Sequence, residues 1–362
     1  MKISLGSKIV EGPWGGGNFF LINLKNYLEK KGHEVVFDLC HSDIDVILFT
    51  DPRPKIYSSS TISYKDIQQY KKYVNKNVAT VQRINECDER KGTIGINSLY
   101  LKSSDIADRV VFVSTWLKEL YLRLGLPEEK SSVILSGSDS KIFNPSNKNI
   151  RKIDEKFKIV THHWSSNIFK GFKIYSHLDN LLNKKFWNDR FEFTFIGNIS
   201  DEYNFENTKI MKPLSGDSLA TEIKKNDIYL TASINEPSGN HHIEAAQCGL
   251  PILYYISGGI PEYCDGYGLG FENNFEDQLL EISEHYFEFQ RKMKYYPRNA
   301  DKTNTEFLDL FENTFSELTK NMNKNNKFFQ IIFLIKFKIS KFIIFKFKSK
   351  ILRTYLKIKT YL

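Results

Sequence analysis

The chain has 362 residues, of which 41% are hydrophobic and 26% are charged, as is ordinary for globular proteins. This length suggests two domains that each bury a core of their own. The formal charge of +8 is local, because residues 327–362 hold ten of the 51 basic residues and none of the 43 acidic ones. The remaining 41 basic and 43 acidic residues nearly balance, which argues against nucleic acid as a partner.

The four cysteines are widely spaced in the sequence and form no C-x-x-C pair: Cys40, Cys87, Cys248 and Cys264. This spacing argues against a zinc site or a disulfide framework and is consistent with a reducing compartment. Met1 and Lys2 lead directly into an apolar segment without the pattern of a signal peptide. We therefore expect a cytoplasmic protein.

The first predicted strand, Lys2 to Leu5, is followed by a glycine-rich segment, Gly12-Pro13-Trp14-Gly15-Gly16-Gly17. A helix is expected next, from about Phe19 to Lys31. Consecutive glycines at the carboxyl end of a strand let the backbone pass close to a ligand. The segment is neither a G-x-G-x-x-G fingerprint nor a P-loop, so a simple turn and a binding loop both stay open.

Strand and helix candidates alternate through the rest of this half, which predicts a parallel sheet covered by helices. They are Val35 to Leu39, Val46 to Phe49, Tyr64 to Val74, Val78 to Ile84, Val110 to Val113 and Val133 to Leu135. The polar cluster that begins at Asn85 and includes Asp88 follows a strand, so it is either a loop that faces a substrate, the acceptor of a transferred group, or a solvated turn. Asn144 to Asp154 has no apolar period and is the expected interdomain linker.

The strand pattern restarts with Lys158 to Thr161 and continues at Phe193 to Ile196. Lys170 precedes Gly171 at the expected start of a helix, where a cation would neutralise a diphosphate leaving group. A surface lysine is the alternative. The paired histidines at 162–163 and 241–242 have no acid or i,i+4 partner at ligand spacing, so we predict no metal.

The stretch from Ile228 to Phe271 is the most informative part of the chain, because it reads as strand, polar loop, helix and strand, a βαβ unit. In parallel sheets, ligands bind beyond the carboxyl ends of the strands. Glu236 and Glu244 lie eight positions apart and could face one ligand there, although a helix cap and a solvated residue are the plainer interpretation. Between them a helix is expected to start at Ser238, Gly239, Asn240 and His241. The free backbone N–H groups of such a start suit a phosphate. Carboxylates suit sugar hydroxyls, and the chemistry implied is a nucleotide sugar.

This stretch also resembles the E-x7-E signature of retaining glycosyltransferases with the GT-B fold, especially glycosyltransferase family 4. The matching segments are Glu236-Pro237-Ser238-Gly239, Glu244-Ala245-Ala246, Gly249-Leu250-Pro251-Ile252 and Gly258-Gly259-Ile260-Pro261-Glu262. The phrase from Ala107 to Ser114 is also typical of the family. The resemblance covers about residues 1 to 320. It implies an α/β protein in which two Rossmann-like domains face each other across a cleft.

The resemblance further implies transfer of a sugar from a nucleoside-diphosphate sugar, a substrate rather than a cofactor, to an acceptor hydroxyl with retained configuration. Glu244 would hold the ribose and Glu236 would lie beside the donor sugar. Phosphate would be held by Lys170 and by the helix start, while Gly16 and Gly17 would approach the diphosphate. Asn85 and Asp88 would lie on the acceptor side.

The chain departs from the family pattern at two places. Trp164 stands where arginine is usual, and Ser136-Gly137-Ser138-Asp139 replaces the common Asn-Gly-Val-Asp. These departures keep one alternative open, a catalytically impaired, membrane-associated subunit that binds sugar nucleotides. A related GT-B epimerase or phosphorylase is the other alternative.

We predict an acceptor-side domain over 1–150, a donor domain over 151–325 and a basic, aromatic-rich tail over 326–362. The longest uncharged run of the tail, Phe328 to Ile335, is too short to span a bilayer, which takes about 20 apolar residues. Acid-free, aromatic and basic segments are typical of attachment to an anionic membrane surface. We therefore expect a hexosyltransferase on the inner face of a bacterial membrane. It would act on a glycan or lipid-linked acceptor in surface polysaccharide or glycolipid synthesis.

Overall fold

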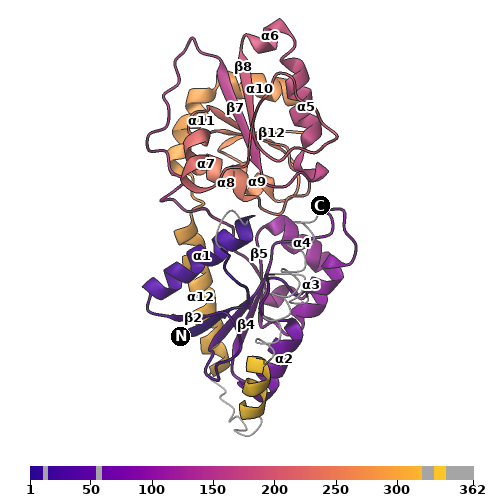
Figure 1. The fold of residues 1–362 in the computed structure, drawn as a ribbon, viewed down its shortest axis with the longest axis vertical. Helices are drawn as coiled ribbons and strands as arrows, with labels where there is room; N and C mark the ends of the chain where they lie inside the picture. Colours follow the sequence, from indigo (N-terminus) through magenta and orange to yellow (C-terminus); the bar gives the residue numbers. More distant parts are fainter. Residues whose placement is uncertain (11–14, 54–58, 320–329, 340–362) are drawn as a thin grey trace, which may run out of the picture.

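The computed structural model describes residues 1–10, 15–53, 59–319 and 330–339, which form two lobes along the long axis of the molecule (Figure 1). Each lobe contains a six-stranded, wholly parallel sheet. The first has the order β2-β1-β3-β4-β5-β6, with β1 (Lys2–Leu5), β2 (Glu34–Val36), β3 (Val46–Phe49), β4 (Ala79–Ile84), β5 (Arg109–Phe112) and β6 (Ser131–Val133). The second has the order β12-β11-β10-β7-β8-β9, with β7 (Phe157–His163), β8 (Phe191–Gly197), β9 (Lys209–Met211), β10 (Ile228–Thr231), β11 (Ile252–Tyr255) and β12 (Gly268–Phe271). The predicted α/β class with two parallel sheets is confirmed.

Helices cover both faces of the first sheet, which explains why strands such as β3 are apolar at every position. One face carries α1 (Gly15–Lys30), and the other carries α2 (Tyr64–Tyr73), α3 (Ile96–Ser104) and α4 (Thr115–Arg123). The α2 helix begins with a capping box in which the side chains of Ser63 and Asp66 each accept a hydrogen bond from the other's backbone N–H.

The second sheet is covered in the same way. One face packs against α5 (Phe172–Leu181), α10 (Phe275–Glu284) and α11 (Tyr286–Lys292), and the other packs against α7 (Gly216–Ile223), α8 (Asn240–Gln247) and α9 (Ile260–Cys264). The short helix α6 (Lys185–Asn188) precedes β8. The sequence predicts one helix from about Phe275 to Lys294, but the structure divides it at His285 into α10 and α11.

The last long helix, α12 (Ala300–Thr319), returns to the first lobe (Figure 1). Its side chains Phe307 and Phe311 share an apolar core with Leu21 and Leu24 of α1. The chain therefore passes between the lobes twice, once after β6 and once before α12.

The glycine-rich segment differs from its prediction, since α1 begins at Gly15 and Gly16 and Gly17 lie within its first turn. Residues 12–14 of that segment lie outside the described residues. A Cβ on Gly16 would lie 2.7 Å from the Asn240 amide nitrogen across the cleft, whereas one on Gly17 would meet no atom within 4 Å. At Gly16, therefore, the absence of a side chain permits close packing of α1 against α8.

Part of the predicted tail is folded against the first lobe. Residues 330–339 form a helix in which Phe333 stacks on Tyr73 of α2, with ring centroids 4.2 Å apart. Phe337 is 5% exposed, and the Gln330 side chain donates to the Val74 carbonyl at 3.2 Å. The spacing of the lysines in the tail sequence, which do not gather on one side of a helix, did not predict this helix. The rest of the tail, 326–329 and 340–362, lies outside the described residues.

None of the helices in the described ranges combines the length and the apolar character that a membrane crossing requires.

Candidate active site

The carboxyl ends of the two sheets face each other and enclose a cavity of about 290 Å³. Ten of its lining residues come from the second lobe, namely His162, His163, Trp164, Ser165, Lys170, Glu236, Ser238, Gly239, Asn240 and His241. The first lobe contributes Gly16, Gly17, Arg83, Asn85 and Arg90. The structure thus brings together every candidate residue named from the sequence except Glu244 and Asp88.

The loop that carries Glu236 is shaped by left-handed backbone at both ends, with φ of 51° at Asn235 and 74° at Gly239. It rests on the turn at Gly258 and Gly259, where the Gly259 N–H donates to the Glu236 carbonyl at 2.9 Å. A Cβ on Gly258 would lie 2.5 Å from that same carbonyl oxygen. The β10–α8 loop is therefore held in place by a turn that tolerates no side chain.

Glu236 is 3% exposed and lies between two cations. Its carboxylate accepts a hydrogen bond from Lys170 Nζ at 2.5 Å and forms an ion pair with Arg90 Nε at 2.9 Å. Burial alone would raise the pKa of Glu236, but the charges of Arg90 and Lys170 outweigh it and lower the pKa to about 2. Glu236 is consequently ionised throughout the physiological pH range.

Lys170 ends a short 3-10 turn, Ile168–Lys170, after which Gly171 adopts a φ of 90° and opens α5. The turn aims the ammonium group at the Glu236 loop. Burial lowers the pKa of Lys170, and the nearby Glu236 carboxylate partly offsets this effect. Arg90 reaches the same carboxylate from the opposite lobe, so two cations converge where the sequence predicted one.

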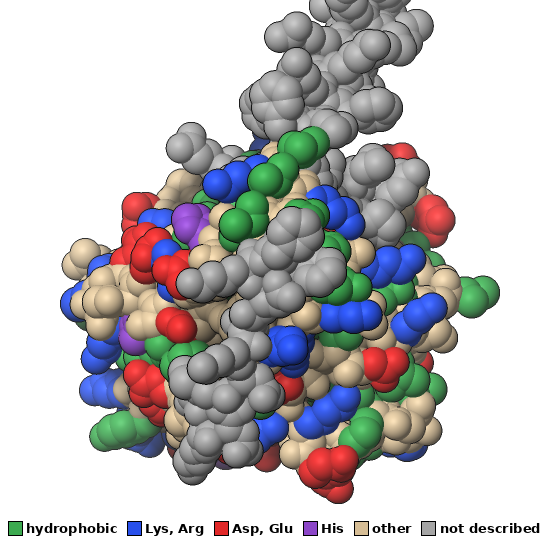
Figure 2. Space-filling model, turned by 90° about the horizontal axis from the view of Figure 1, so that it is seen from below, with side chains coloured by type: hydrophobic (Ala, Val, Ile, Leu, Met, Phe, Trp, Pro, Cys, Tyr) green, Lys and Arg blue, Asp and Glu red, His purple; other side chains and the backbone are tan. Residues whose placement is uncertain are grey.

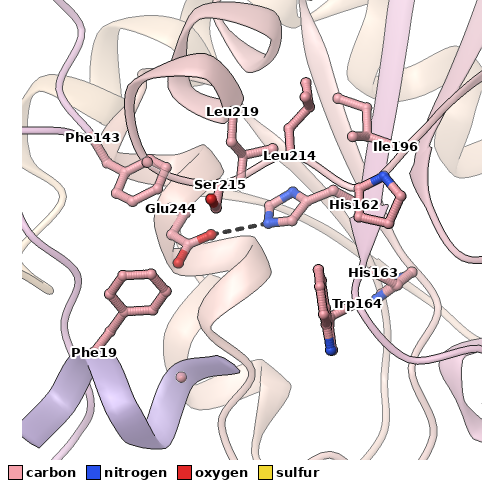
Figure 3. A pocket seen from close by; sticks show the side chains of 13 residues that line it. Phe19, Phe143, His162, His163, Trp164, Ile196, Leu214, Ser215, Leu219 and Glu244 are labelled. Atoms are coloured by element: carbon pink, nitrogen blue, oxygen red, sulfur yellow. Dashed lines mark hydrogen bonds and ion pairs between the residues drawn. The ribbon is translucent and has the colours of Figure 1, made fainter. Parts of the chain in front are cut away.

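Glu244 lines a second cavity of about 90 Å³ (Figure 3). This cavity adjoins the first, since the two share lining residues. Its carboxylate lies 3.0 Å from His162 Nε2, which fixes the side chain at the mouth of this space. The remaining walls are largely apolar, with Phe19, Phe143, Ile196, Leu214 and Leu219 around it (Figure 3). A narrow apolar slot with one carboxylate at its edge suits a flat base attached to a sugar that carries hydroxyl groups.

The two acceptor-side candidates have different surroundings. Asn85 lines the main cavity, whereas Asp88 borders none of the three described cavities. The Asp88 carboxylate instead accepts hydrogen bonds from the Thr93 hydroxyl and from the backbone N–H groups of Gly95, Ile96 and Asn97. Burial opposes its ionisation, but these hydrogen bonds outweigh that effect and lower the pKa of Asp88. Its observed contacts are those of a cap at the start of α3.

Trp164, which replaces the usual arginine, is 54% exposed and lines both cavities. Sequence reasoning did not single out Arg83, Arg90 or the contact between His162 and Glu244. The only signal for Arg83 was that it is the one charged residue of the predicted strand Val78 to Ile84. Arg90 lay inside a polar loop that held several equivalent charges.

The four histidines at 162–163 and 241–242 lie close together, with the His163 and His241 ring centroids 4.7 Å apart. Burial lowers the pKa of His163 and His241 well below the usual value and that of His242 to about 3. Within the described part of the chain, no three histidine, cysteine, aspartate or glutamate side chains are grouped as metal ligands would be. The ring nitrogens of His163 and His241 instead contact hydroxyl groups of Tyr175 and Thr231.

Comparison with known proteins relates this site to a protein family. The profile of the family described as Glycosyl transferases group 1 matches residues 152–327, which contain the Glu236 loop, Lys170 and Glu244. The chain is a glycosyltransferase whose residues 152–327 match the group 1 family. This glycosyltransferase family is a retaining one and takes the transferred sugar from a nucleotide sugar. No curated protein sequence matches the chain.

The fold of this glycosyltransferase is similar to that of several solved structures. Sucrose-phosphate synthase from Thermosynechococcus elongatus aligns with a TM-score of 0.60 at 14% identity, over 87% of this chain and 98% of that one. HepE from Anabaena, solved with UDP and glucose, gives 0.61 at 14% identity, over 86% and 99%. The catalytic domain of starch synthase IV from Arabidopsis thaliana, bound to ADP and acarbose, gives 0.56 at 13%, over 84% and 79%. At these identities the likeness establishes a GT-B-like fold.

Proposed function

We propose that this glycosyltransferase moves a hexose from a nucleoside-diphosphate sugar to an acceptor hydroxyl, with the donor lying across the two adjoining cavities. The observation that carries the proposal is their continuity. The apolar slot beside Glu244 opens into the cavity that holds the α8 start, Lys170 and Glu236, and both cavities share Gly16, His162, His163 and Trp164.

Each part of such a donor has chemically matched residues along this path. The base occupies the slot between Phe143 and Leu214, and the ribose hydroxyls donate to Glu244, which His162 holds in place. The diphosphate lies at the amino-terminal end of α8, whose first backbone N–H groups have no partner within the helix. Gly16 and Gly17 complete this side of the diphosphate site.

The sugar then lies beside Glu236, next to the two cations. Lys170 and Arg90 stabilise the negative charge that develops on the leaving phosphate as its bond to the sugar breaks. The second lobe has Trp164 where the family usually has an arginine. Arg90 of the first lobe supplies the second cation in its place. This placement supports an active transferase over a subunit that only binds the donor.

The tail supports a membrane-facing role. On the 330–339 helix, Ile331, Ile335 and Ile339 lie on one side and are each more than 50% exposed. Figure 2 views this end of the first lobe, where hydrophobic side chains lie among lysines and arginines. We propose that the helix and the basic residues of 327–362 rest on an anionic lipid surface, which would suit a lipid-linked or surface-glycan acceptor in a bacterial cell.

A donor panel tests the proposed transfer. UDP-, GDP-, ADP- and CMP-sugars are incubated with the enzyme and a membrane lipid extract, and product formation is followed by mass spectrometry. We expect one donor to be turned over, and we expect Glu244→Ala to raise its KM by about 10- to 100-fold. The control is Glu192→Gln, an exposed glutamate of β8 outside both cavities. Donor binding without any turnover would instead favour a sugar-nucleotide binding subunit, and no binding at all would refute the proposal.

A further inference from the structure

A buried arginine in the first lobe has no role in the donor path described above. Arg83 occupies β4 two positions beyond Val81 and four beyond Ala79, so all three side chains point to the same face of the sheet. Val81 and Ala79 lie in the apolar core beneath α1, while Arg83 lies at the strand's carboxyl end and is 5% exposed.

Among the described residues, the guanidinium group of Arg83 has no counter-ion. It stacks over the Phe20 ring at 4.1 Å and donates to the Ser136 hydroxyl at 3.5 Å, and in the described ranges no carboxylate lies within ion-pair distance of it. Two carboxylates, Asp51 and Glu86, line the same cavity as Arg83, but both are paired elsewhere: Asp51 with Arg53, and Glu86 with Arg90 and Lys91. A buried charge without a partner is costly, which makes an arginine here difficult to explain by packing alone.

Besides its contacts with Phe20 and Ser136, the Arg83 side chain borders two cavities. It lines a cavity of about 240 Å³ on the first lobe and also borders the main cavity between the lobes. The 240 Å³ cavity is also lined by Lys8 and Asn85 and by the ion-paired Asp51, Arg53 and Glu86. Lys8 is a second cation without an ion-pair partner among the described residues. Three groups rich in hydrogen-bond donors therefore converge on a site that opens toward the proposed sugar position.

We propose that this cavity binds an anionic group of the acceptor, a phosphate or a carboxylate, and that Arg83 is its principal ligand. The proposal rests on the function proposed above and adds the chemical class of the acceptor. A planar guanidinium donates two parallel hydrogen bonds to either group, and Lys8 adds a point charge at the exposed rim. The acceptor hydroxyl would then be presented from the first lobe toward Glu236.

The donor's own diphosphate is the competing occupant. Lys170 and the start of α8 stand on the second lobe, whereas Arg83 stands on the first lobe with Gly17 and Asn85, and these three residues line both cavities. An arginine that served the donor would affect nucleotide binding. One that serves the acceptor would leave it unchanged.

The first experiment measures anion binding without turnover. Thermal unfolding is followed while inorganic phosphate is added to enzyme already saturated with its nucleoside diphosphate, so that the donor site is filled. We expect phosphate to raise the Tm of the natural protein but not that of Arg83→Met. In the absence of phosphate, the Tm of Arg83→Met should equal or exceed that of the natural protein, because an unpaired buried charge is replaced by an apolar side chain. Equal phosphate shifts in the two proteins would overturn the proposal.

The second experiment measures transfer. Acceptors that match except for a phosphate, a carboxylate or no charge are compared, each in a soluble and a lipid-linked form. Arg83→Met should raise KM for the anionic acceptors by about 10- to 100-fold and leave KM for the donor unchanged. Arg83→Lys should recover part of this loss because it restores the charge but not the paired hydrogen bonds. Arg190→Met is the control, since Arg190 also stacks on a phenylalanine, Phe186, but in the second lobe away from the cleft.

The outcomes separate this inference from the proposed function. Slow hydrolysis of the donor by water, measured without any acceptor, tests donor use alone. If the donor is hydrolysed and neutral acceptors work as well as anionic ones, the anion site is wrong while the transferase stands. If Arg83→Met weakens nucleotide binding instead, the anion at Arg83 is the donor's and the inference fails.

Discussion

At the scale of single residues, the site depends on a balance between one carboxylate and two cations. Glu236 pairs with both Lys170 and Arg90, which holds the two cations in place. When a diphosphate enters, it competes with Glu236 for the same cations. The carboxylate therefore keeps the site preorganised at some expense in donor affinity.

Glu236→Gln tests this competition. Loss of the carboxylate leaves the largely buried Lys170 without its ion-pair partner and leaves Arg90 with Glu86 alone, so we expect the free energy of unfolding to fall by about 3 kcal/mol. Affinity for the nucleoside diphosphate should rise by roughly tenfold, or about 1.4 kcal/mol, because a like charge has been removed from beside the phosphate. Calorimetric titration measures both the affinity and its salt dependence. Weaker nucleotide binding would show that Glu236 supports the diphosphate rather than competing with it.

The buried histidines make stability depend on pH. Burial lowers the pKa of His242 to about 3, against about 6.5 in an unfolded chain, so protonation favours unfolding. The stability is present above about pH 6.5 and is lost as pH falls. His242 alone should remove about 2 kcal/mol between pH 7 and pH 5, and the lowered pKa values of His163 and His241 act in the same direction.

Urea unfolding at several pH values measures this loss. His242→Phe should flatten the profile, since a phenyl ring preserves the packing on Tyr263, 5.5 Å away, without a titrating group. Glu236 opposes the pKa shift of His242, while Lys170 and His162 reinforce it, and none of these residues is altered. His177→Phe, at an exposed position, is the control and should leave the slope unchanged. An unchanged slope in His242→Phe would contradict the account.

At the scale of elements, the Glu236 loop depends on the turn beneath it. Gly258 and Gly266 both adopt a positive φ, of 64° and 79°, but only Gly258 lies against the Glu236 backbone. Gly266→Ala should therefore cost about 1 kcal/mol of stability from backbone strain alone and leave turnover unchanged. Gly258→Ala should cost more and also reduce kcat, because the loop must shift. Thermal unfolding and donor turnover measure the pair. Equal effects of the two substitutions would show that the turn does not position the loop.

The sequence predicted the elements whose signals are local. One continuous sequence pattern, defined by its apolar strands and its glycines, contains β10, α8 and β11 together with Glu236 and Glu244. The three glycines that begin α1 were less informative, because glycine is compatible both with a turn and with the first turn of a helix. The helix at 330–339 could not be predicted from its lysine spacing, since Phe333 is held by Tyr73, a residue far away in the sequence.

At the scale of the whole molecule, polar contacts join the lobes around the cleft. Glu262 of α9 accepts hydrogen bonds from the backbone N–H groups of Thr115 and Trp116 at the start of α4, at 2.8 and 2.9 Å. Arg90 pairs with Glu236, and the Asn235 side chain donates to the Glu89 carbonyl at 3.2 Å. Sequence reasoning missed these contacts between lobes, because each joins residues from opposite halves of the chain.

Glu262→Gln tests whether these contacts set the closed arrangement. The charged cap at the start of α4 contributes typically about 1 kcal/mol, and its loss should favour a more open cleft. Small-angle X-ray scattering should then show a larger radius of gyration without donor. Saturating nucleoside diphosphate should return the radius to that of the natural protein. Glu128→Gln, which alters an exposed glutamate within the first lobe, should leave the radius unchanged. Identical scattering from all variants would show that the Glu262 cap does not set the closed arrangement.

The central claim is that a nucleotide sugar lies across the two adjoining cavities, and the most direct measurement is a crystal structure with the nucleoside diphosphate of the preferred donor. We predict the base between Phe143 and Leu214, the ribose hydroxyls on Glu244 and the phosphates at the start of α8 beside Lys170. A nucleotide bound elsewhere, or one whose ribose does not contact Glu244, would contradict the account.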